Sequence, residues 1–280
     1  MGLDAVRVMS QNRAEVTVVI PMYNSAATIE RALKSVTTQT LLPRQVIVIN
    51  DASTDDCLKI VQNWKDPNLT LEIINNVSNL GPSASRNSGW DRAVTEYIAF
   101  LDADDAWHPM KLEIQYGLAK DHPEISLIGH RYDIADDTVW PSIEIHSLSI
   151  RKFSFNDFLV KNRLSTPTVM TKSALTNRFA PEQRYSEDYR LWLELTADHG
   201  PALFVNLPLA RLFKPAYGSS GQSSKSLAML NGELQTITAL KKNSKIGNPM
   251  LAGLKIWAIT KFLRRKLKSA VTREGTKCRI

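Results

Sequence analysis

Three carboxylates directly follow an apolar run in the first half of the chain. The run covers residues 97–101, and the acids are Asp102, Asp104 and Asp105. A run of this length and composition predicts a strand buried on both faces, as in a parallel sheet. Three acids so close together need a positive charge, and Mg²⁺ or Mn²⁺ could supply it while also binding phosphate oxygens. The alternative is a solvated acidic turn that caps the helix beginning near Pro109.

Two earlier runs end in polar residues in the same way. Residues 16–20 and 46–49 are rich in β-branched side chains, and each leads into a polar turn. The three runs are followed by stretches that can form helices, at 26–37, 55–65 and 109–120. Strands alternating with helices predict a parallel sheet with crossover connections. Because ligands bind such sheets outside the carboxyl ends of the strands, we expect Tyr23, Asp51 and the acidic cluster to line one crevice.

Four segments together resemble the ordered signatures of family 2 glycosyltransferases. They are residues 18–24, 48–55, 79–89 and 100–105. Each is short, but they occur in the family's order, and the resemblance is clear from about residue 16 to about residue 115 and weaker to about residue 215. It implies an α/β protein of GT-A fold, with a Rossmann-like nucleotide-binding, mostly parallel sheet flanked by helices.

The resemblance implies a nucleotide site at the ends of the first strands. Tyr23 would stack on the base, and Asp51 would accept a hydrogen bond from an imide N–H, which favours uracil or thymine. A local turn with Ser53 and Thr54, or an N-cap, is the alternative role for Asp51. The other residues that the resemblance assigns to nucleotide binding are Pro21, Asn24, Gly81, Arg86, Asp102 and Ala103.

The resemblance also implies a divalent metal and contacts to the donor's diphosphate. Asp104 would bind Mn²⁺ or Mg²⁺ directly, with Asp102 at the ribose or a metal-bound water. Arg86 follows a Gly-Pro-Ser-Ala-Ser segment that can open a helix, and would bind the diphosphate bidentately. A position on the surface of that helix is the alternative. Lys214 stands where the family often has Arg, and no His follows it, so contact with phosphate through a point charge is expected there.

A pair of acids in the second half is the candidate for catalysis. Leu191, Trp192 and Leu195 share one helical face, which places Glu187 and Asp188 at the start of that helix. Acids there complement the helix dipole, and from the residues alone this is the favoured interpretation. The pair resembles the family's Glu-Asp pair, which implies that Asp188 is the general base of an inverting transfer. Glu187 would orient the acceptor or act as a dipole partner.

The pattern is weakest over residues 131–168. Asp136 and Asp137 have the appearance of a second metal site, although a solvated turn is the favoured interpretation. Trp140 could contact an acceptor sugar or simply pack in the core or on the surface. The Gly- and Ser-rich run 218–226 predicts a loop, which either closes over the donor or links the domain to the tail.

The net charge of +7 comes from the C-terminal tail. Residues 241–280 contain 12 Lys or Arg and one acid, Glu274, a net of +11 that leaves −4 for the rest of the chain. An apolar set recurs at helical spacing and is called the tail stripe: Ala252, Ile256, Ile259, Leu263, Leu267 and Ala270. The pattern is typical of an interfacial helix on an anionic membrane surface. Docking of this stripe on the core and a dimer contact are the alternatives, and no motif indicates nucleic acid.

Length allows a large α/β domain over residues 1–217, followed by residues 218–280 as a loop and a basic helical extension. No apolar run is long enough to span a membrane, and residues 1–14 have no apolar centre typical of a signal peptide. Two scattered cysteines fit a reducing cytoplasm, so we expect a cytoplasmic protein, peripheral on the inner face of the plasma membrane through its tail. The oligomeric state is not predicted.

These patterns together predict an inverting, metal-dependent glycosyltransferase. The donor would be a UDP- or dTDP-sugar, and the acceptor a glycan or lipid-linked hydroxyl in surface polysaccharide assembly of bacterial type. The alternative is a non-catalytic protein of the same fold that binds nucleotide-sugars or acts as a scaffold. The presence of both Asp104 and Asp188 argues against that alternative.

Overall fold

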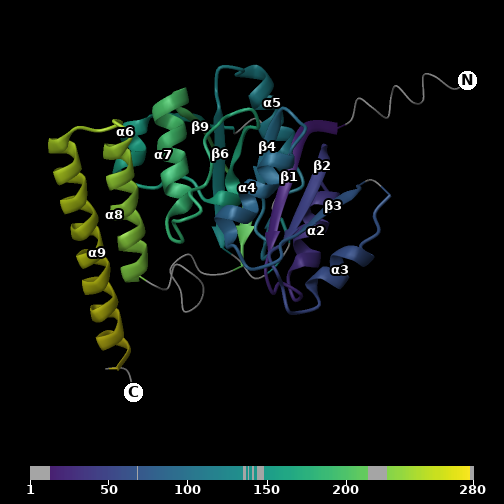
Figure 1. Cartoon of the computed structure of the whole chain (residues 1–280), viewed down its shortest axis with the longest axis horizontal. Helices are drawn as coiled ribbons and strands as arrows, with labels where there is room; N and C mark the ends of the chain where they lie inside the picture. Colours follow the sequence, from purple (N-terminus) through teal and green to yellow (C-terminus); the bar gives the residue numbers. More distant parts are fainter. Residues whose placement is uncertain are drawn as a thin grey trace, which may run out of the picture.

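A nine-stranded sheet forms the centre of the protein in the computed structural model (Figure 1). Residues 13–67, 69–134, 137, 139–140, 142–143, 148–213 and 226–277 are described, with side chains up to residue 267. The strand order is β3-β2-β1-β4-β8-β6-β9-β5, with β7 also paired to β9. The strands are β1 Arg13–Met22, β2 Leu42–Asn50, β3 Leu71–Asn75, β4 Tyr97–Phe100, β5 Asp105–Trp107, β6 Leu127–Ile134, β7 Ile150–Phe153, β8 Met170–Lys172 and β9 Ala202–Leu212.

The predicted α/β architecture is confirmed, and its parallel part is the half of the sheet built by the first four strands. β3, β2, β1 and β4 are parallel neighbours, and the three predicted apolar runs form β1, β2 and β4. The second half is mixed, since β8 is antiparallel to β4 and β6, and β9 is parallel to β6 but antiparallel to β5 and β7. The antiparallel strands were not predicted because β5 and β8 have only three residues each.

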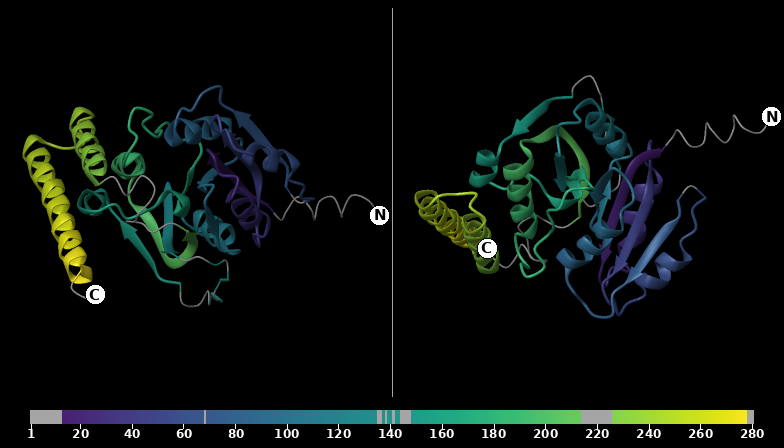
Figure 2. Two further views of the ribbon diagram at one scale, coloured as in Figure 1. Left: turned by 90° about the horizontal axis from the view of Figure 1, so that it is seen from below. Right: turned by 45° about the horizontal axis from the view of Figure 1, so that its top comes forward.

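Helices cover both faces of the sheet (Figures 1 and 2). One apolar cluster joins the sheet to α2, α3 and α5, and a second joins it to α4, α6 and α7. The helices are α2 Ile29–Thr37, α3 Cys57–Asn63, α4 Pro82–Arg92, α5 Lys111–Asp121, α6 Phe155–Val160, α7 Glu187–His199, α8 Ser226–Lys242 and α9 Asn248–Lys277. The predicted helices at 26–37, 55–65 and 109–120 are therefore confirmed as α2, α3 and α5.

The strand register brings the polar turns to one edge of the sheet, as predicted. Pro21 of β1 is paired with Ile49 of β2, and Val19 is paired with Phe100 of β4. The turns that follow these three strands thus leave the sheet side by side. Helix α4 packs tightly beneath them, because a Cβ at Gly89 would lie 2.5 Å from a methyl carbon of Val19.

Helices α8 and α9 form a hairpin beside α7, with α9 outermost (Figures 1 and 2). The helix α9 packs through Ala258, Leu251 and Leu254, which join the second apolar cluster. The tail stripe lies elsewhere on α9, and Ile256 and Leu267 are 65% and 67% exposed. Docking of that stripe on the core, one of the alternatives above, is therefore wrong. No helix in the described part of the chain is long and apolar enough to cross a membrane.

Candidate active site

The turns after β1 and β2 are held together by hydrogen bonds. The Thr54 N–H donates to Asn24 Oδ1 over 2.8 Å, and the Asn24 N–H donates to Ser53 Oγ over 3.2 Å. Asn24 adopts a φ of +48°, a conformation that asparagine tolerates better than most residues. These contacts fix the turn that carries Tyr23, which is 50% exposed. An aromatic ring is thus presented at the sheet edge where the sequence predicted base stacking.

The carboxylate of Asp51 is buried and holds the loop that leads into α4. Asn76 Nδ2 donates to its Oδ1 over 2.7 Å, the Leu80 N–H donates to Oδ1 over 2.9 Å, and the Gly81 N–H donates to Oδ2 over 2.8 Å. These partners differ from the local turn considered above. Gly81 has a φ of +85°, which glycine adopts readily. Asp51 therefore joins two of the segments assigned to nucleotide binding, and its contact with a base stays a prediction.

The acidic cluster obtains positive charge from an arginine of α2. Arg31 Nη2 donates to the Asp104 carbonyl oxygen, and burial lowers the pKa of Arg31 while the charges of Asp105 and Asp104 oppose that effect. Asp102 and Asp104 are partly exposed, whereas Ala103 is buried. The alternative of a capping turn is wrong, because Asp105 begins β5 and the N-cap of α5 is Met110, which follows the last acid of the cluster by five residues.

Arg86 lies inside the protein between two carboxylates. Its Nη2 is 2.7 Å from Asp102 Oδ1, its Nη1 is 3.3 Å from Glu187 Oε1, and its side chain is only 6% exposed. Burial alone would lower the pKa of Arg86, but the charges of Asp102 and Glu187 outweigh burial and raise it. The alternative of a surface arginine on α4 is therefore wrong. This guanidinium connects the acidic cluster to the start of α7.

The predicted acid pair lies at the start of α7, with both carboxyls near Arg86. Burial raises the pKa of Glu187 to about 7; the charge of Arg86 opposes this shift and that of Asp188 adds to it. Burial also raises the pKa of Asp188. Two hydrogen bonds act in the opposite direction and lower it: the Tyr189 N–H donates to Oδ1 over 2.6 Å, and Asn162 Nδ2 donates to Oδ2 over 3.2 Å. Asp188 is thus a carboxylate that two hydrogen bonds keep in position and whose raised pKa makes it more basic, and both properties suit a general base.

Hydrogen bonds from Gln183 connect the turn before this acid pair to α8. Gln183 Nε2 donates to the carbonyl oxygens of Tyr185, Ser186 and Gly232 at 2.9, 3.1 and 3.2 Å, and to Thr236 Oγ1 at 2.9 Å. Ser186 is the N-cap of α7 and has a φ of +56°, so the chain turns sharply there. The helix α8 thereby contributes to the position of both carboxylates.

We predict that Gly232→Ala disturbs this arrangement, because a Cβ at Gly232 would lie 2.2 Å from the Tyr185 carbonyl oxygen. Either α8 or the turn before α7 must shift, at a cost of about 1–3 kcal/mol in the free energy of unfolding. Chemical denaturation measures this loss. The control is Gly253→Ala on α9, whose Cβ would meet no atom within 4 Å, and which should be neutral or stabilising. Equal effects of the two substitutions would contradict the proposed role of α8.

The residues present fit a divalent metal that is bound together with a ligand. In the part of the chain that the structure describes, no three His, Cys, Asp or Glu residues are grouped so as to hold a metal. Mg²⁺ and Mn²⁺ commonly use one or two carboxylates and take the remaining ligands from phosphates and water. Asp102 and Asp104 offer such carboxylates, although Oδ1 of Asp102 is already bonded to Arg86.

Of the two remaining candidates for contact with the acceptor or the diphosphate, Trp140 is described by the structure and Lys214 is not. Trp140 packs edge-on against the ring of His108, just after β5, and the Arg211 guanidinium lies 4.4 Å from its ring centre. Arg211 also pairs with Asp137, whereas Asp136 lies outside the described residues. Lys214 lies outside the described residues.

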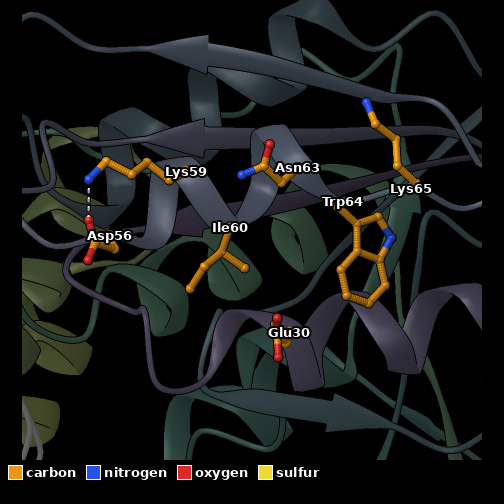
Figure 3. A pocket seen from close by; sticks show the side chains of 7 residues that line it. All are labelled: Glu30, Asp56, Lys59, Ile60, Asn63, Trp64 and Lys65. Carbon is orange, nitrogen blue, oxygen red and sulfur yellow. Dashed lines mark hydrogen bonds and ion pairs between the residues drawn. The ribbon is translucent and has the colours of Figure 1, made fainter.

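A hollow of about 650 Å³ lies between α2 and α3 (Figure 3). Its lining residues are Glu30, Asp56, Lys59, Ile60, Asn63, Trp64 and Lys65. None of the predicted site residues is among them. The chemistry of the site is therefore argued from its carboxylates and not from this hollow.

Sequence reasoning missed the residues that connect the site. Arg31, Asn162, Gln183 and Gly232 each contact a predicted site residue or the turn that carries it. Only Arg31 lies in a segment with a clear helical pattern, and in that segment it lies outside the apolar face of α2. The contact of Asn162 with Asp188 and that of Gln183 with Gly232 join positions 26 and 49 residues apart, which no local pattern reports.

Comparison with known proteins identifies the class. Residues 17–182 match the family model described as Glycosyl transferase family 2, and the chain belongs to this family. The UDP-Glc:alpha-D-GlcNAc-diphosphoundecaprenol beta-1,3-glucosyltransferase WfgD of Escherichia coli is 30% identical over 184 residues, which cover 66% of this chain and 70% of that protein.

Two solved structures share the fold. TarS 1–349 of S. aureus in complex with UDP-GlcNAc has a TM-score of 0.68 at 19% identity, over 90% of this chain and 72% of that chain. The mannosyltransferase PcManGT of Pyrobaculum calidifontis, in complex with GDP-Man and Mn²⁺, has a TM-score of 0.64 at 18% identity, over 95% and 80% of the two chains. The predicted GT-A fold is thus confirmed.

Proposed function

We propose that this protein is an inverting glycosyltransferase that uses a UDP- or dTDP-sugar. The observation that carries the proposal is the network in which Arg86 joins Asp102 of the nucleotide motif to Glu187, next to Asp188. The half-buried carboxylate of Asp188, whose pKa is raised by desolvation, lies next to this network, and this supports its role as the base. The name of the similar WfgD protein, which includes UDP-Glc and a diphosphoundecaprenol-linked acceptor, supports a UDP-sugar and a lipid-linked hydroxyl.

Binding of a pyrimidine base is compatible with the contacts of Asp51. An ionised carboxylate has about four lone-pair positions, and three N–H groups of the 76–81 loop donate to this one. One position remains for an imide N–H of uracil or thymine. The exposed ring of Tyr23 can stack on the same base.

The transfer step needs one base and a stabilised leaving group. Asp188 takes the proton of the acceptor hydroxyl while the hydroxyl oxygen forms a bond to the anomeric carbon. The bond from that carbon to the diphosphate breaks on the opposite face, and its electron pair leaves with the nucleoside diphosphate. Asp104, with Asp102, would hold Mn²⁺ or Mg²⁺, which supplies positive charge for the diphosphate when bound. Glu187 would help to orient the acceptor.

The proposal extends to the setting of the reaction. A lipid-linked acceptor fits assembly of a bacterial-type surface polysaccharide, in which the enzyme works at the cytoplasmic face of the plasma membrane. We propose residues 1–217 as the transferase domain and the rest as its extension. The boundary between them falls outside the described residues.

Calorimetric titration with UDP, dTDP, GDP, CDP and ADP, each with and without Mn²⁺, tests the donor site. We predict that UDP or dTDP binds tightly only with Mn²⁺, and that Asp104→Asn weakens this binding at least about tenfold, or 1.4 kcal/mol. The matched control is Asp121→Asn at the exposed end of α5, which should bind as the native protein does. Unchanged affinity of Asp104→Asn would place the metal elsewhere, and preference for a purine nucleotide would refute the role of Asp51.

A further inference from the structure

The outward face of α9 is apolar along its centre. The helix uses Leu251, Leu254 and Ala258 to pack against the rest of the protein. Four residues of the tail stripe remain exposed: Ile256 by 65%, Ile259 by 43%, Leu263 by 53% and Leu267 by 67%. At 100° per residue these four fall on one side of the helix, away from the packed side. A continuous row of branched aliphatic side chains therefore faces solvent.

Basic residues border this row, and acids are absent from it. Residues 248–267 contain five Lys or Arg and no Asp or Glu. Lys261 is paired with Glu233 of α8 on the packed side. Helical geometry places Lys255 and Lys266 along one border of the row and Arg264 along the other. The face thus combines an apolar centre with a positive rim.

We infer that this face of α9 docks on an anionic lipid bilayer. An aliphatic row with basic borders lets the apolar side chains enter the acyl region while the cations meet the negative headgroups. A second copy of the chain fits less well, because pairing two such faces would bring six border cations together, Lys255, Arg264 and Lys266 of each copy, with no acid between them. Nucleic acid would neutralise the rim but leave the aliphatic row exposed.

The position of α9 connects this surface to the proposed active site. The helix is outermost in the molecule, and the order inward is α8 and then α7 (Figures 1 and 2). Gln183 links α8 to the turn before Glu187. A bilayer on the outward face of α9 would therefore hold the acceptor-side acids at a fixed distance from the lipid surface. This consequence rests on the proposed lipid-linked acceptor, whereas the docking itself does not.

Vesicle co-sedimentation of the full chain tests the inference. We expect binding to vesicles that contain phosphatidylglycerol and much weaker binding to pure phosphatidylcholine. Leu263→Asp should lower the partition to anionic vesicles at least about tenfold, because it removes an exposed leucine that would enter the bilayer and adds a charge of the same sign as the headgroups. Val94→Asp, at another exposed apolar residue, is the matched control and should bind as the native protein does. Both positions are exposed, so neither change should alter the circular dichroism spectrum.

Equal partition of Leu263→Asp and native protein would overturn the inference. A lipid-free dimer that Leu263→Asp dissociates, without vesicle binding, would also overturn it and assign the face to a second copy. Vesicle binding needs neither donor nor acceptor, so it is independent of UDP binding measured on the same sample. Docking without UDP binding would refute the proposed function and leave the inference intact.

Discussion

Asp188→Asn should lose sugar transfer by a factor of about 10²–10⁴ while UDP binding stays within about twofold of the native value. Asparagine has nearly the same shape but cannot take up the acceptor's proton. The Tyr189 N–H donates to Oδ1 of the native carboxylate and Asn162 Nδ2 donates to Oδ2, so the amide oxygen of the variant can keep one of these two hydrogen bonds. The fold around the start of α7 should therefore survive the change.

The measurement is the acceptor-dependent release of UDP, alongside calorimetric binding of UDP to the same variant. Asp198→Asn is the matched control, because it removes an acid from the other end of α7, where Asp198 pairs with Lys245. It should transfer sugar at close to the native rate. Full activity of Asp188→Asn would eliminate this residue as the base, and an inactive native protein that binds UDP would favour the non-catalytic alternative.

Transfer should also depend on pH in a definite direction. Asp188 acts as a base only when it is ionised, and burial raises its pKa above the ordinary 3.8. The rate should therefore fall on the acid side at a higher pH than an exposed aspartate would cause. Acceptor-dependent rates measured across the acid range report this pKa directly.

Arg86→Met should destabilise the protein by about 3–5 kcal/mol near neutral pH. The arginine lies between Asp102 and Glu187 with only 6% of its side chain exposed. Methionine fills much of the same space but leaves both carboxylates without their shared cation. Removing one partner of a buried ionic network costs more than the network itself contributes, because the remaining charge is uncompensated.

The loss in Arg86→Met should shrink as the pH falls. Burial raises the pKa of Glu187 to about 7 in the folded protein from an ordinary 4.5, so the folded state binds this proton more tightly than the unfolded state does. Stability from this group is fully present below about 4.5 and is lost as the pH rises through 7. Without Arg86 the folded pKa rises further, so the decline should extend to higher pH.

Denaturant unfolding at several pH values tests this prediction. Arg92→Met is the matched control, because Arg92 lies on the same helix and pairs with Glu72 at an exposed site. It should remain near native stability at every pH, since exposed ion pairs contribute little. The double variant Arg86→Met with Glu187→Gln should recover part of the loss. A pH-independent loss in Arg86→Met would contradict the assigned coupling.

The sequence predicted the parts of the site that lie in local patterns. The ends of β1, β2 and β4 follow from short apolar runs, and the start of α7 follows from the face shared by Leu191, Trp192 and Leu195. Each of these signals is contained within about one helix or strand, where periodicity is informative. The order of the family signatures then gave the fold.

What the sequence could not predict are contacts between distant segments. Arg86 could be assigned to a helix but not to a place between two carboxylates, because its partner Glu187 is 101 residues away. The helical spacing of the tail stripe could be read from the sequence, but the exposure of its members up to Leu267 depends on which side of α9 meets α8. Gly232 gave no signal, since its importance comes from a single close approach to Tyr185.

The most direct test of the central claim is the stereochemistry of transfer. The native protein would be incubated with Mn²⁺, a polyprenyl-diphosphate-linked saccharide and each of several α-linked UDP- and dTDP-sugars, and the product would be analysed by NMR spectroscopy. We expect one donor to give a β-linked product, formed only when the acceptor is present. An α-linked product would contradict single displacement with Asp188 as the base, and no transfer from any donor by a protein that binds UDP would contradict the proposed activity.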